Sequence, residues 1–399
     1  MWRVQLKLCL TLTLALLNTP ITAKTGIKVP LRYHPEFGVY TTDITIGNQP
    51  PQTVEAIIDT GSSSMVFTTN EKYCPNCNQA LTKGVVDPEK IGSDALTKTV
   101  HLTYGSAKDS AIEYLAPIQY SKEEKTSLMM KIFLLKDSDQ PTSIVGMIHH
   151  NMRRDQVDYV PFMVKITDNF NKYHELSLLL CAEQGASYYY IGPKQFSKHP
   201  HQSKLLKSPF YEVNTSGLYD AANQPVAKTQ APFQGAILDT GTGGFILLTP
   251  ELYRPLHTYI YQHAGKKNQQ LSADFWQKNY CILKQEVNFS ALPKIKIGFQ
   301  DASSKQPYFL MIPPTTYLSQ AGCGEGYVRL VFTPGLPLGH PVAIRNHLSR
   351  LNARVRPAMV IGTSLLNHYA ISIYYQPNPR IEFSENHALC HPKQDDHRA

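Results

Sequence analysis

The chain is poor in tryptophan, in charge and in long apolar runs. Of its 399 residues only 18% are charged, and only two are tryptophan, Trp2 and Trp276. No apolar run reaches the roughly 18 residues that a membrane-spanning helix needs, so we expect no integral membrane span. Lysine and arginine outnumber the acidic residues by 39 to 31, but they never form a block of like charge. A nucleic-acid partner is therefore not expected.

Cysteine is also scarce, with seven residues in all. Cys9 lies in the first residues, and the other six are an even number, which in an exported chain predicts three disulfides among fifteen possible pairings. Cys74 and Cys77 form a Cys-Pro-Asn-Cys motif that could also be half of a zinc site or a redox pair. A zinc site would need a second Cys or His pair at suitable spacing, and none is evident. A small disulfide-closed loop is favoured.

The first residues have the three-part pattern of a secretory signal. Arg3 and Lys7 supply positive charge, residues 8–17 are mostly apolar, and residues 21–23 form a small-residue exit. We predict a signal peptide at 1–23 and an exported chain with a secreted, periplasmic or lysosome-like destination. The remaining length suits two cores of about 150 to 200 residues each.

A duplicated motif is the strongest positive signal. Residues 57–62, Ile-Ile-Asp-Thr-Gly-Ser, recur as residues 237–242, Ile-Leu-Asp-Thr-Gly-Thr, 180 positions later. In each copy an apolar run typical of a buried strand leads into a tight turn. One Asp-Thr-Gly arises easily by chance, but two with the same lead-in predict a duplicated fold. Such a fold would bring Asp59 and Asp239 together at a pseudo-twofold axis.

Strand patterns dominate the rest of the chain. Short alternating or apolar runs predict strands at 40–47, 54–58, 132–135, 176–180, 188–191, 295–299 and 370–375. Helical patterns are confined to 250–263, which begins with a proline, and 273–280. A polar stretch between Gly192 and Ser208 separates the two motifs and is the predicted linker. We expect an all-β protein with an N-terminal lobe at 24–196, a C-terminal lobe at 197–390 and a flexible tail at 391–399.

Two facing carboxylates imply a specific chemistry. They cannot both ionise, so the pair holds one shared proton over an acidic range. The ionised member can take a proton from water while the protonated member polarises a carbonyl. In each motif the glycine would let a backbone N–H approach the carboxylate, the next residue would donate a hydroxyl, and the threonine would brace the turn. These supporting residues are Thr60, Gly61 and Ser62 in the first copy, and Thr240, Gly241 and Thr242 in the second.

Together these features resemble the pepsin family of aspartic proteases across nearly all of the mature sequence. Residues 103–106 lie where the family carries its flap, which makes Tyr104, Gly105 and Ser106 the expected substrate-binding residues. Residues 144–147 and 360–363 resemble the apolar-apolar-Gly element that completes the loop under each aspartate. The resemblance implies two pseudo-twofold-related β-barrel lobes, an inter-lobe cleft, and a monomeric endopeptidase that cuts polypeptides at acidic pH. It implies neither a metal nor a cofactor.

The resemblance also implies disulfide pairs. Cys74 and Cys77 sit where the family closes a small N-lobe loop, and Cys281 and Cys323 bracket a Leu-Pro strand start as the family's C-lobe disulfide does. Cys181 and Cys390 have no family counterpart. A bond between them would join the end of the N-terminal lobe to the C-terminus, and the sequence leaves this pairing open.

The chain departs from the family in several places. It lacks the tryptophan that often follows the first motif, so Tyr104 has no indole partner there. Gly243 and Gly244 follow the second motif and are expected to loosen that stretch. The remaining departures are Ala107 for a second flap glycine, Thr363 for a usual aspartate, and a span of only 35 residues from Lys24 to Asp59. That span has no room for an inhibitory prosegment, as in members made without a zymogen stage.

A non-catalytic peptide- or protein-binding module on the same fold is the alternative. Such proteins usually lose one aspartate or its hydroxyl partner. Here both Asp-Thr-Gly triplets and both hydroxyl residues are present. The sequence therefore favours an aspartic endopeptidase with Asp59 and Asp239 as its catalytic residues.

Overall fold

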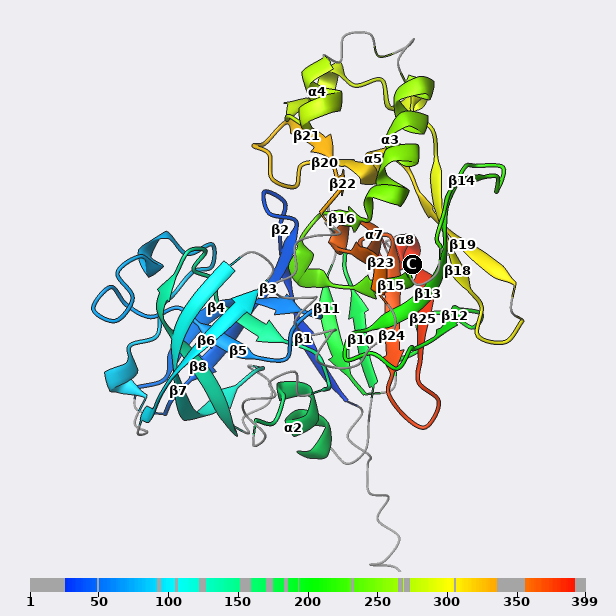
Figure 1. The fold of residues 1–399 in the computed structure, drawn as a ribbon. Coiled ribbons are helices and arrows are strands. Elements are labelled where there is room, and N and C mark those ends of the chain that lie inside the picture. The colour runs from blue at the N-terminus through cyan, green and yellow to red at the C-terminus, as the bar shows by residue number, and fades with distance from the viewer. Residues whose placement is uncertain are drawn as a thin grey trace, which may run out of the picture.

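The computed structural model describes residues 26–48, 50–91, 95–104, 107–121, 127–150, 159–169, 175–182, 186–192, 194–230, 233–264, 268, 273–304, 306–335 and 356–391. The predicted signal peptide, the flap residues Gly105 and Ser106, and residues 392–399 of the tail lie outside this part. The described chain is mainly β, as predicted, and its strands form three large sheets and one small one (Figure 1).

The first sheet is built from the N-terminal half of the chain. Its eight strands run in the order β2 (Arg32–His34), β3 (Val39–Ile46), β4 (Gln52–Asp59), β9 (Ile144–Gly146), β5 (Met65–Phe67), β8 (Leu128–Ser138), β7 (Ala107–Gln119) and β6 (Ala95–Tyr104). The pairs β4–β9 and β5–β8 are parallel, and the other neighbours are antiparallel. β4 therefore lies inside the sheet and is buried along most of its length, which explains its nearly continuous apolar run.

The second sheet has the same kind of order in the C-terminal half. It runs β19 (Pro307–Ile312), β18 (Ile295–Gln300), β13 (Glu212–Tyr219), β15 (Phe233–Leu238), β23 (Arg356–Ile361), β16 (Ile246–Leu248) and β22 (Phe332–Thr333), with β14 (Pro225–Lys228) paired to β13. Here β15–β23 and β16–β22 are the parallel pairs. A small third sheet holds β17 (Ile282–Leu283), β21 (Tyr327–Leu330) and β20 (Leu318–Ser319).

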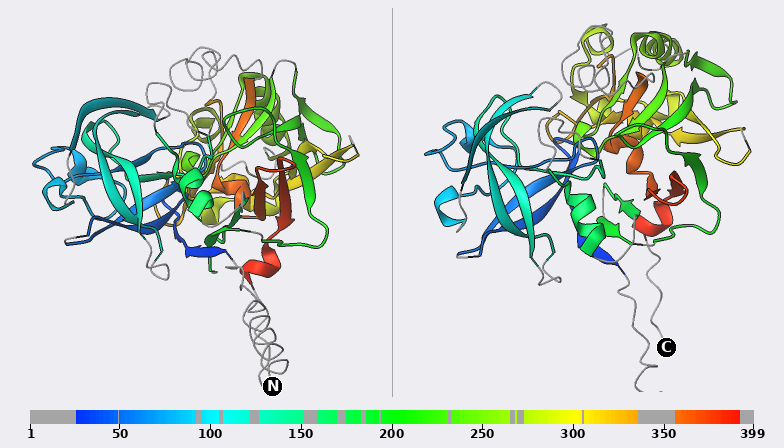
Figure 2. Two further views of the ribbon diagram at one scale, coloured as in Figure 1. Left: turned by 90° about the horizontal axis from the view of Figure 1, so that it is seen from below. Right: turned by 60° about the horizontal axis from the view of Figure 1, so that its bottom comes forward.

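A six-stranded antiparallel sheet combines strands from both halves of the chain. Its order is β1 (Ile27–Pro30), β11 (Tyr188–Ile191), β10 (Glu175–Leu179), β24 (Tyr369–Tyr374), β25 (Arg380–Glu385) and β12 (His201–Lys204). It lies where the two larger sheets meet, and the first and last described elements, β1 and α8 (His387–Cys390), are on the same side of the molecule (Figure 2). β12 corrects the prediction of a linker here: only Ser203 of this strand is buried, so its local sequence carries little strand signal.

Helices are short and few among the described residues. They are α2 (Phe162–Asn169), α3 (Pro250–Ala264), α4 (Ala273–Lys278), α5 (Pro314–Tyr317) and α7 (Thr363–Leu366), besides α8, with 3₁₀ turns at Cys77–Gln79, Pro88–Lys90, Thr240–Thr242, Lys284–Glu286 and Phe289–Ala291. α3 confirms the helix predicted at 250–263, and it buries Leu252, Leu256 and Ile260 at four-residue spacing. α4 ends two residues earlier than predicted because Asn279 takes a positive φ and its amide pairs with the main chain of Leu330.

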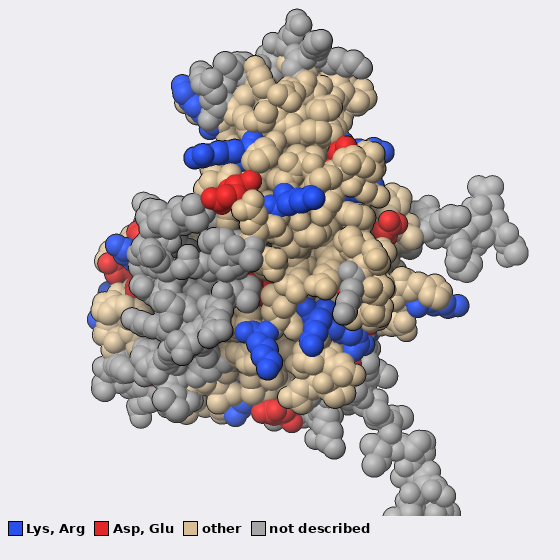
Figure 3. Space-filling view, turned by 45° about the vertical axis from the view of Figure 1, so that its right-hand side comes forward, with Lys and Arg blue, Asp and Glu red and all other residues tan. Residues whose placement is uncertain are grey.

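The described surface carries no concentrated charge on the face shown in Figure 3. Lys and Arg lie there in small groups separated by uncharged surface, with Asp and Glu between them. Within the described ranges, no helix combines the length and the apolar character that crossing a membrane requires.

Three disulfides link the chain: Cys74–Cys77, Cys181–Cys390 and Cys281–Cys323. Cys181–Cys390 joins residues 209 positions apart and packs with Leu179, Tyr188 and Ala370 at the six-stranded sheet. The Cys-Pro-Asn-Cys motif thus closes a small loop, as favoured from the sequence, and its two sulfur atoms bond each other.

The long disulfide is expected to stabilise the folded chain more than either of the other two, because it closes the longest loop. The Cys181→Ser/Cys390→Ser variant should lose about 3 to 5 kcal/mol of unfolding free energy, because the bond restricts a long loop in the unfolded chain. The Cys74→Ser/Cys77→Ser variant, whose loop spans three positions, is the matched control and should lose less. Urea titrations of both variants would measure the difference, and equal losses would contradict the expectation.

Candidate active site

Asp59 is placed by two neighbouring parallel strands of the first sheet. It is the last residue of β4, and it pairs with Gly146 at the end of the parallel strand β9. The main chain of the β9 exit then holds the Asp59 loop, because Met147 donates its N–H to the Asp59 carbonyl at 2.7 Å and Ile148 donates to Ser62 at 2.9 Å. A β-carbon on Gly146 would lie 2.6 Å from the main chain of Ser63, so this approach requires glycine.

Asp239 is placed by the equivalent pair of parallel strands in the second sheet. It follows β15, and its N–H donates to Ile361 at the end of the parallel strand β23 at 2.9 Å. Beyond Ile361, Thr363 donates to the Gly243 carbonyl at 2.7 Å. A β-carbon on Gly362 would lie 2.1 Å from the Gly243 oxygen. Each aspartate loop is therefore held by main-chain contacts with the apolar-apolar-Gly segment of its own half.

The threonines of the two motifs bind each other reciprocally. The Thr60 N–H donates to Thr240 Oγ1 at 3.1 Å, and the Thr240 N–H donates to Thr60 Oγ1 at 2.9 Å. Each hydroxyl then donates to the opposite strand, Thr60 to the Leu238 carbonyl at 3.0 Å and Thr240 to the Ile58 carbonyl. Both threonines are fully buried, so these four bonds fix the two loops relative to each other.

The two carboxylates face one another across the glycines. Asp59 Oδ1 accepts from the Gly61 N–H at 2.7 Å, and Asp239 Oδ1 accepts from the Gly241 N–H at 2.8 Å. A β-carbon on Gly61 would lie 2.4 Å from Asp239 Cγ, and one on Gly241 would lie 2.4 Å from Asp59 Oδ1. Each carboxylate therefore occupies the space that a side chain at the opposite glycine would need.

The environment of Asp59 favours its protonated form. Burial raises its pKa well above the usual value, and the charge of Asp239 and a hydrogen bond between the two carboxyl groups raise it further. Ser62 and the Gly61 N–H act in the opposite direction. Asp59 is buried, with 7% of its surface exposed, whereas Asp239 is half-buried. Asp59 is therefore the carboxyl group that keeps its proton to a higher pH than an ordinary aspartate does.

The two hydroxyl residues of the motifs differ in their contacts. Thr242 donates its hydroxyl to Asp239 Oδ2 at 2.8 Å, and its N–H lies 3.3 Å from Oδ1. Ser62 lies close enough to lower the pKa of Asp59, but within the described residues its buried Oγ has no hydrogen-bond partner of normal geometry. The outer oxygens of the two carboxylates are therefore held unequally.

The double glycine after the second motif is a tight contact between the two halves of the chain. The turn between β2 and β3 reaches this segment: a β-carbon on Gly243 would lie 2.6 Å from the Phe37 oxygen, and one on Gly38 would lie 2.4 Å from the Gly244 nitrogen. Gly38 and Gly243 both have φ of +66°, which favours glycine. The Thr363 hydroxyl also donates to the Gly38 carbonyl. The prediction that Gly243 and Gly244 loosen this stretch was wrong.

Tyr159 is a supporting residue that sequence reasoning missed. Its hydroxyl donates to the Ser63 carbonyl at 2.9 Å and accepts from the Met65 N–H at 3.2 Å, and its ring packs against Phe133. It thereby holds the segment that follows the first motif. No local pattern around 159 signals this contact, which depends on a residue 96 positions away.

The expected flap is described only in part. β6 and β7 pair as a hairpin up to Tyr104 and Ala107. Only the main-chain place of Tyr104, at the end of β6, is described, and Gly105 and Ser106 lie outside the described residues. The substrate-binding role of these three residues stays a prediction.

Near the start of β7, Asp109 should make stability depend on pH. Burial raises its pKa to about 6, against its hydrogen bond with Ser138 and together with the nearby charges of Asp139 and Asp137. Its contribution to stability is complete below the ordinary pKa of 3.8 and is lost as the pH rises through about 6. Asp109→Asn should remove about 1 to 2 kcal/mol of that loss, after allowance for solvent screening. Urea titrations at about pH 4 and pH 7 measure it, and an unchanged pH dependence would contradict the assignment.

Comparison with known proteins found no matching protein-family model and no matching curated protein.

Proposed function

We propose that this protein is an aspartic endopeptidase that hydrolyses polypeptides at acidic pH, with Asp59 and Asp239 sharing the acid and base roles. The observation that carries the proposal is the facing pair of carboxylates, each held by the N–H of its own motif glycine, with the pKa of Asp59 raised by burial and by Asp239. The repeated sequence motif and the equivalent pairs of parallel strands support it. The proposal includes a two-lobed pepsin-like fold, with one large sheet in each lobe.

The chemistry follows from one shared proton. A water held between the carboxylates gives a proton to the ionised one as its oxygen attacks the peptide carbonyl carbon, and the protonated carboxyl gives its proton to the carbonyl oxygen. The resulting diol collapses as the C–N bond breaks: the amine nitrogen takes the proton of the protonated carboxyl, and one diol hydroxyl gives its proton to the other carboxylate. The products are a carboxylic acid and an amine, and the pair again holds one proton. The Gly61 and Gly241 N–H groups and the Thr60–Thr240 bonds keep both carboxylates in place throughout.

Three disulfides support an exported chain with a secreted, periplasmic or lysosome-like destination. In such a setting the substrates would be polypeptides with an accessible extended segment. A monomer suffices for this chemistry because one chain supplies both carboxylates.

A cleavage assay tests the proposal. The purified protein is incubated with an unfolded polypeptide at about pH 4, with and without pepstatin, and the products are identified by mass spectrometry. Internal cuts that pepstatin abolishes, with activity falling as the pH rises toward neutral, are expected. Binding of the polypeptide without any cut across the acidic range would overturn the proposal in favour of a non-catalytic peptide-binding module.

A further inference from the structure

Two tyrosines occupy equivalent places beside the two aspartate strands. In the first sheet Thr41 of β3 pairs with Ile57, and Tyr40 is one step further along that ladder, beside Ile58. In the second sheet Glu212 of β13 pairs with Ile237, and Tyr211 is one step further, where its carbonyl accepts the Leu238 N–H at 2.9 Å. Tyr40 and Tyr211 thus each flank the residue that precedes a catalytic aspartate.

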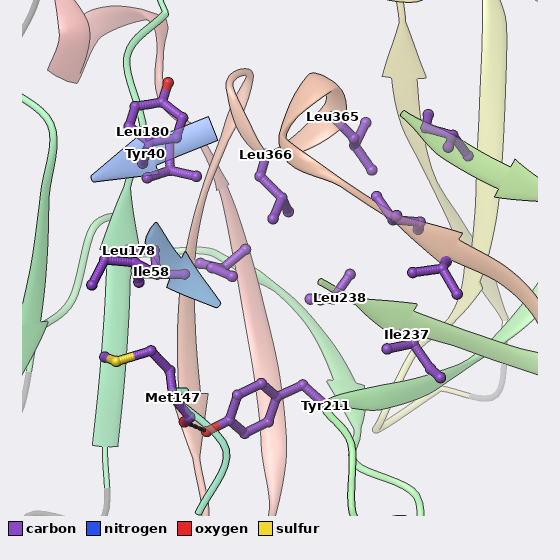
Figure 4. Close-up of a cluster of buried hydrophobic side chains, with 14 of the residues drawn as sticks. Tyr40, Ile58, Met147, Leu178, Leu180, Tyr211, Ile237, Leu238, Leu365 and Leu366 are labelled. Carbon is purple, nitrogen blue, oxygen red and sulfur yellow. Dashed lines mark hydrogen bonds between the residues drawn. The ribbon is translucent and has the colours of Figure 1, made fainter. Parts of the chain in front are cut away.

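Tyr211 reaches across to the loop of the other aspartate. Its hydroxyl donates to the Met147 carbonyl at 2.5 Å (Figure 4), and Met147 donates its own N–H to the Asp59 carbonyl at 2.7 Å. The main chain of Tyr211 therefore bonds the strand that leads to Asp239, and its side chain bonds Met147, which supports the Asp59 loop. Only one residue, Met147, lies between its hydroxyl and the Asp59 main chain.

Tyr40 makes the reciprocal connection from the N-terminal half. Its hydroxyl donates to Asn367 Oδ1 at 2.6 Å. Asn367 follows α7, which begins at Thr363, the residue that supports Gly243 behind Asp239. Figure 4 shows Tyr40 and Tyr211 within one apolar cluster, which includes Ile58 and Leu238. Each half of the chain thus donates one buried tyrosine hydroxyl to the segment that supports the aspartate loop of the other half.

Both tyrosine hydroxyl groups keep their protons, and therefore these hydrogen bonds, across the acidic range. Burial raises the pKa of both Tyr40 and Tyr211, so neither loses its proton under those conditions. Tyr211 has one proton, which goes to the Met147 carbonyl, a group that can only accept. Tyr375 must then donate to the Tyr211 oxygen, and the main chain of His149 is also hydrogen-bonded to it. All capacity of the Tyr211 hydroxyl is used.

We propose that Tyr40 and Tyr211 are positioning residues that set the separation of the Asp59 and Asp239 carboxylates by tying each aspartate's support to the opposite half of the molecule. This rests on the proposed endopeptidase function. The Thr60–Thr240 bonds join the two aspartate loops directly. The tyrosines join each half to the segment that supports the other aspartate loop. A shift of one loop by a fraction of an ångström would weaken both the repulsion and the hydrogen bond between the two carboxyl groups. The pair would then hold its shared proton less firmly.

Tyrosine-to-phenylalanine substitutions test the proposal. Tyr40→Phe and Tyr211→Phe should each lower kcat about tenfold with KM little changed, and the double variant about a hundredfold, because the ring packing stays while the hydroxyl and its hydrogen bonds are lost. The matched control is Tyr189→Phe: that tyrosine is equally buried, and within the described chain its hydroxyl has no hydrogen-bond partner. The control should keep the wild-type kcat and pH profile.

A second measurement is independent of catalysis. In protein carrying aspartate labelled with ¹³C at the carboxyl carbon, NMR follows the titration of Asp59, assigned with the Asp59→Asn variant. In Tyr211→Phe the Asp59 titration should move to lower pH, whereas in Tyr189→Phe it should not. If the wild type cleaves nothing but this shift occurs, the endopeptidase proposal fails and the positioning role stands. If neither tyrosine variant changes the titration or kcat beyond the control, the positioning role is wrong. Should one variant not fold, the other decides.

Discussion

Asp59→Asn is expected to lower kcat by at least about 10⁴-fold while the protein stays folded. An amide cannot take a proton from water, and it cannot share one with Asp239, so both the base and the acid functions of the pair are lost. Asp239→Asn should have the same effect, because both loops have the same arrangement: each lies beside a pair of parallel strands, and each carboxylate accepts from the N–H of its own motif glycine. Initial rates on a polypeptide substrate at about pH 4 measure the loss.

The stability of the Asp59→Asn variant separates lost chemistry from lost folding. Because the pKa of Asp59 is raised in the folded protein, its contribution to stability is complete below its unfolded pKa and is lost as the pH rises through the folded value. The asparagine variant lacks this loss and should be at least as stable as the wild type near neutral pH. Asp168→Asn, at an exposed position on α2, is the matched control and should keep full activity. Full, pepstatin-resistant activity in Asp59→Asn would refute the mechanism.

Gly241→Ala is expected to lower kcat about 10³-fold or more with little change in melting temperature. The new methyl group would lie 2.4 Å from Asp59 Oδ1, so the Asp59 carboxylate must leave its place and its bond to the Gly61 N–H. The displaced atoms are the end of a side chain, and Gly241 is not among the residues with positive φ, so the backbone has no comparable conflict. The damage should stay within the carboxylate pair.

Gly324→Ala is the matched control for this change. No atom lies within 4 Å of a β-carbon there, and Gly324 has no positive φ, so activity and stability should both be unchanged. Circular dichroism and thermal melts would verify that the Gly241→Ala protein is folded, and kinetics at acidic pH would measure its activity. Near wild-type activity in this variant would mean that the carboxylates do not function in the facing arrangement.

Sequence alone determined those features that depend on neighbours along the chain. The alternating and apolar runs located β3, β4, β10, β11, β18 and β24 within a few residues, since strand periodicity and flanking turns are local properties. A helical pattern that begins with Pro250 located α3. The repeated Asp-Thr-Gly identified Asp59 and Asp239 as a candidate pair because an apolar run ending in a tight turn is readable in one short window.

Only the tertiary structure decided which distant residues hold that pair in place. The hydroxyls of Tyr40 and Tyr211 meet partners 327 and 64 positions away, and Gly243 is required by the Phe37 carbonyl. β12 and the six-stranded sheet likewise depend on pairing between the two halves. The physical reason is that a buried hydrogen bond or a close backbone contact is set by how sheets pack. Packing brings together residues whose own local patterns are those of any strand or turn.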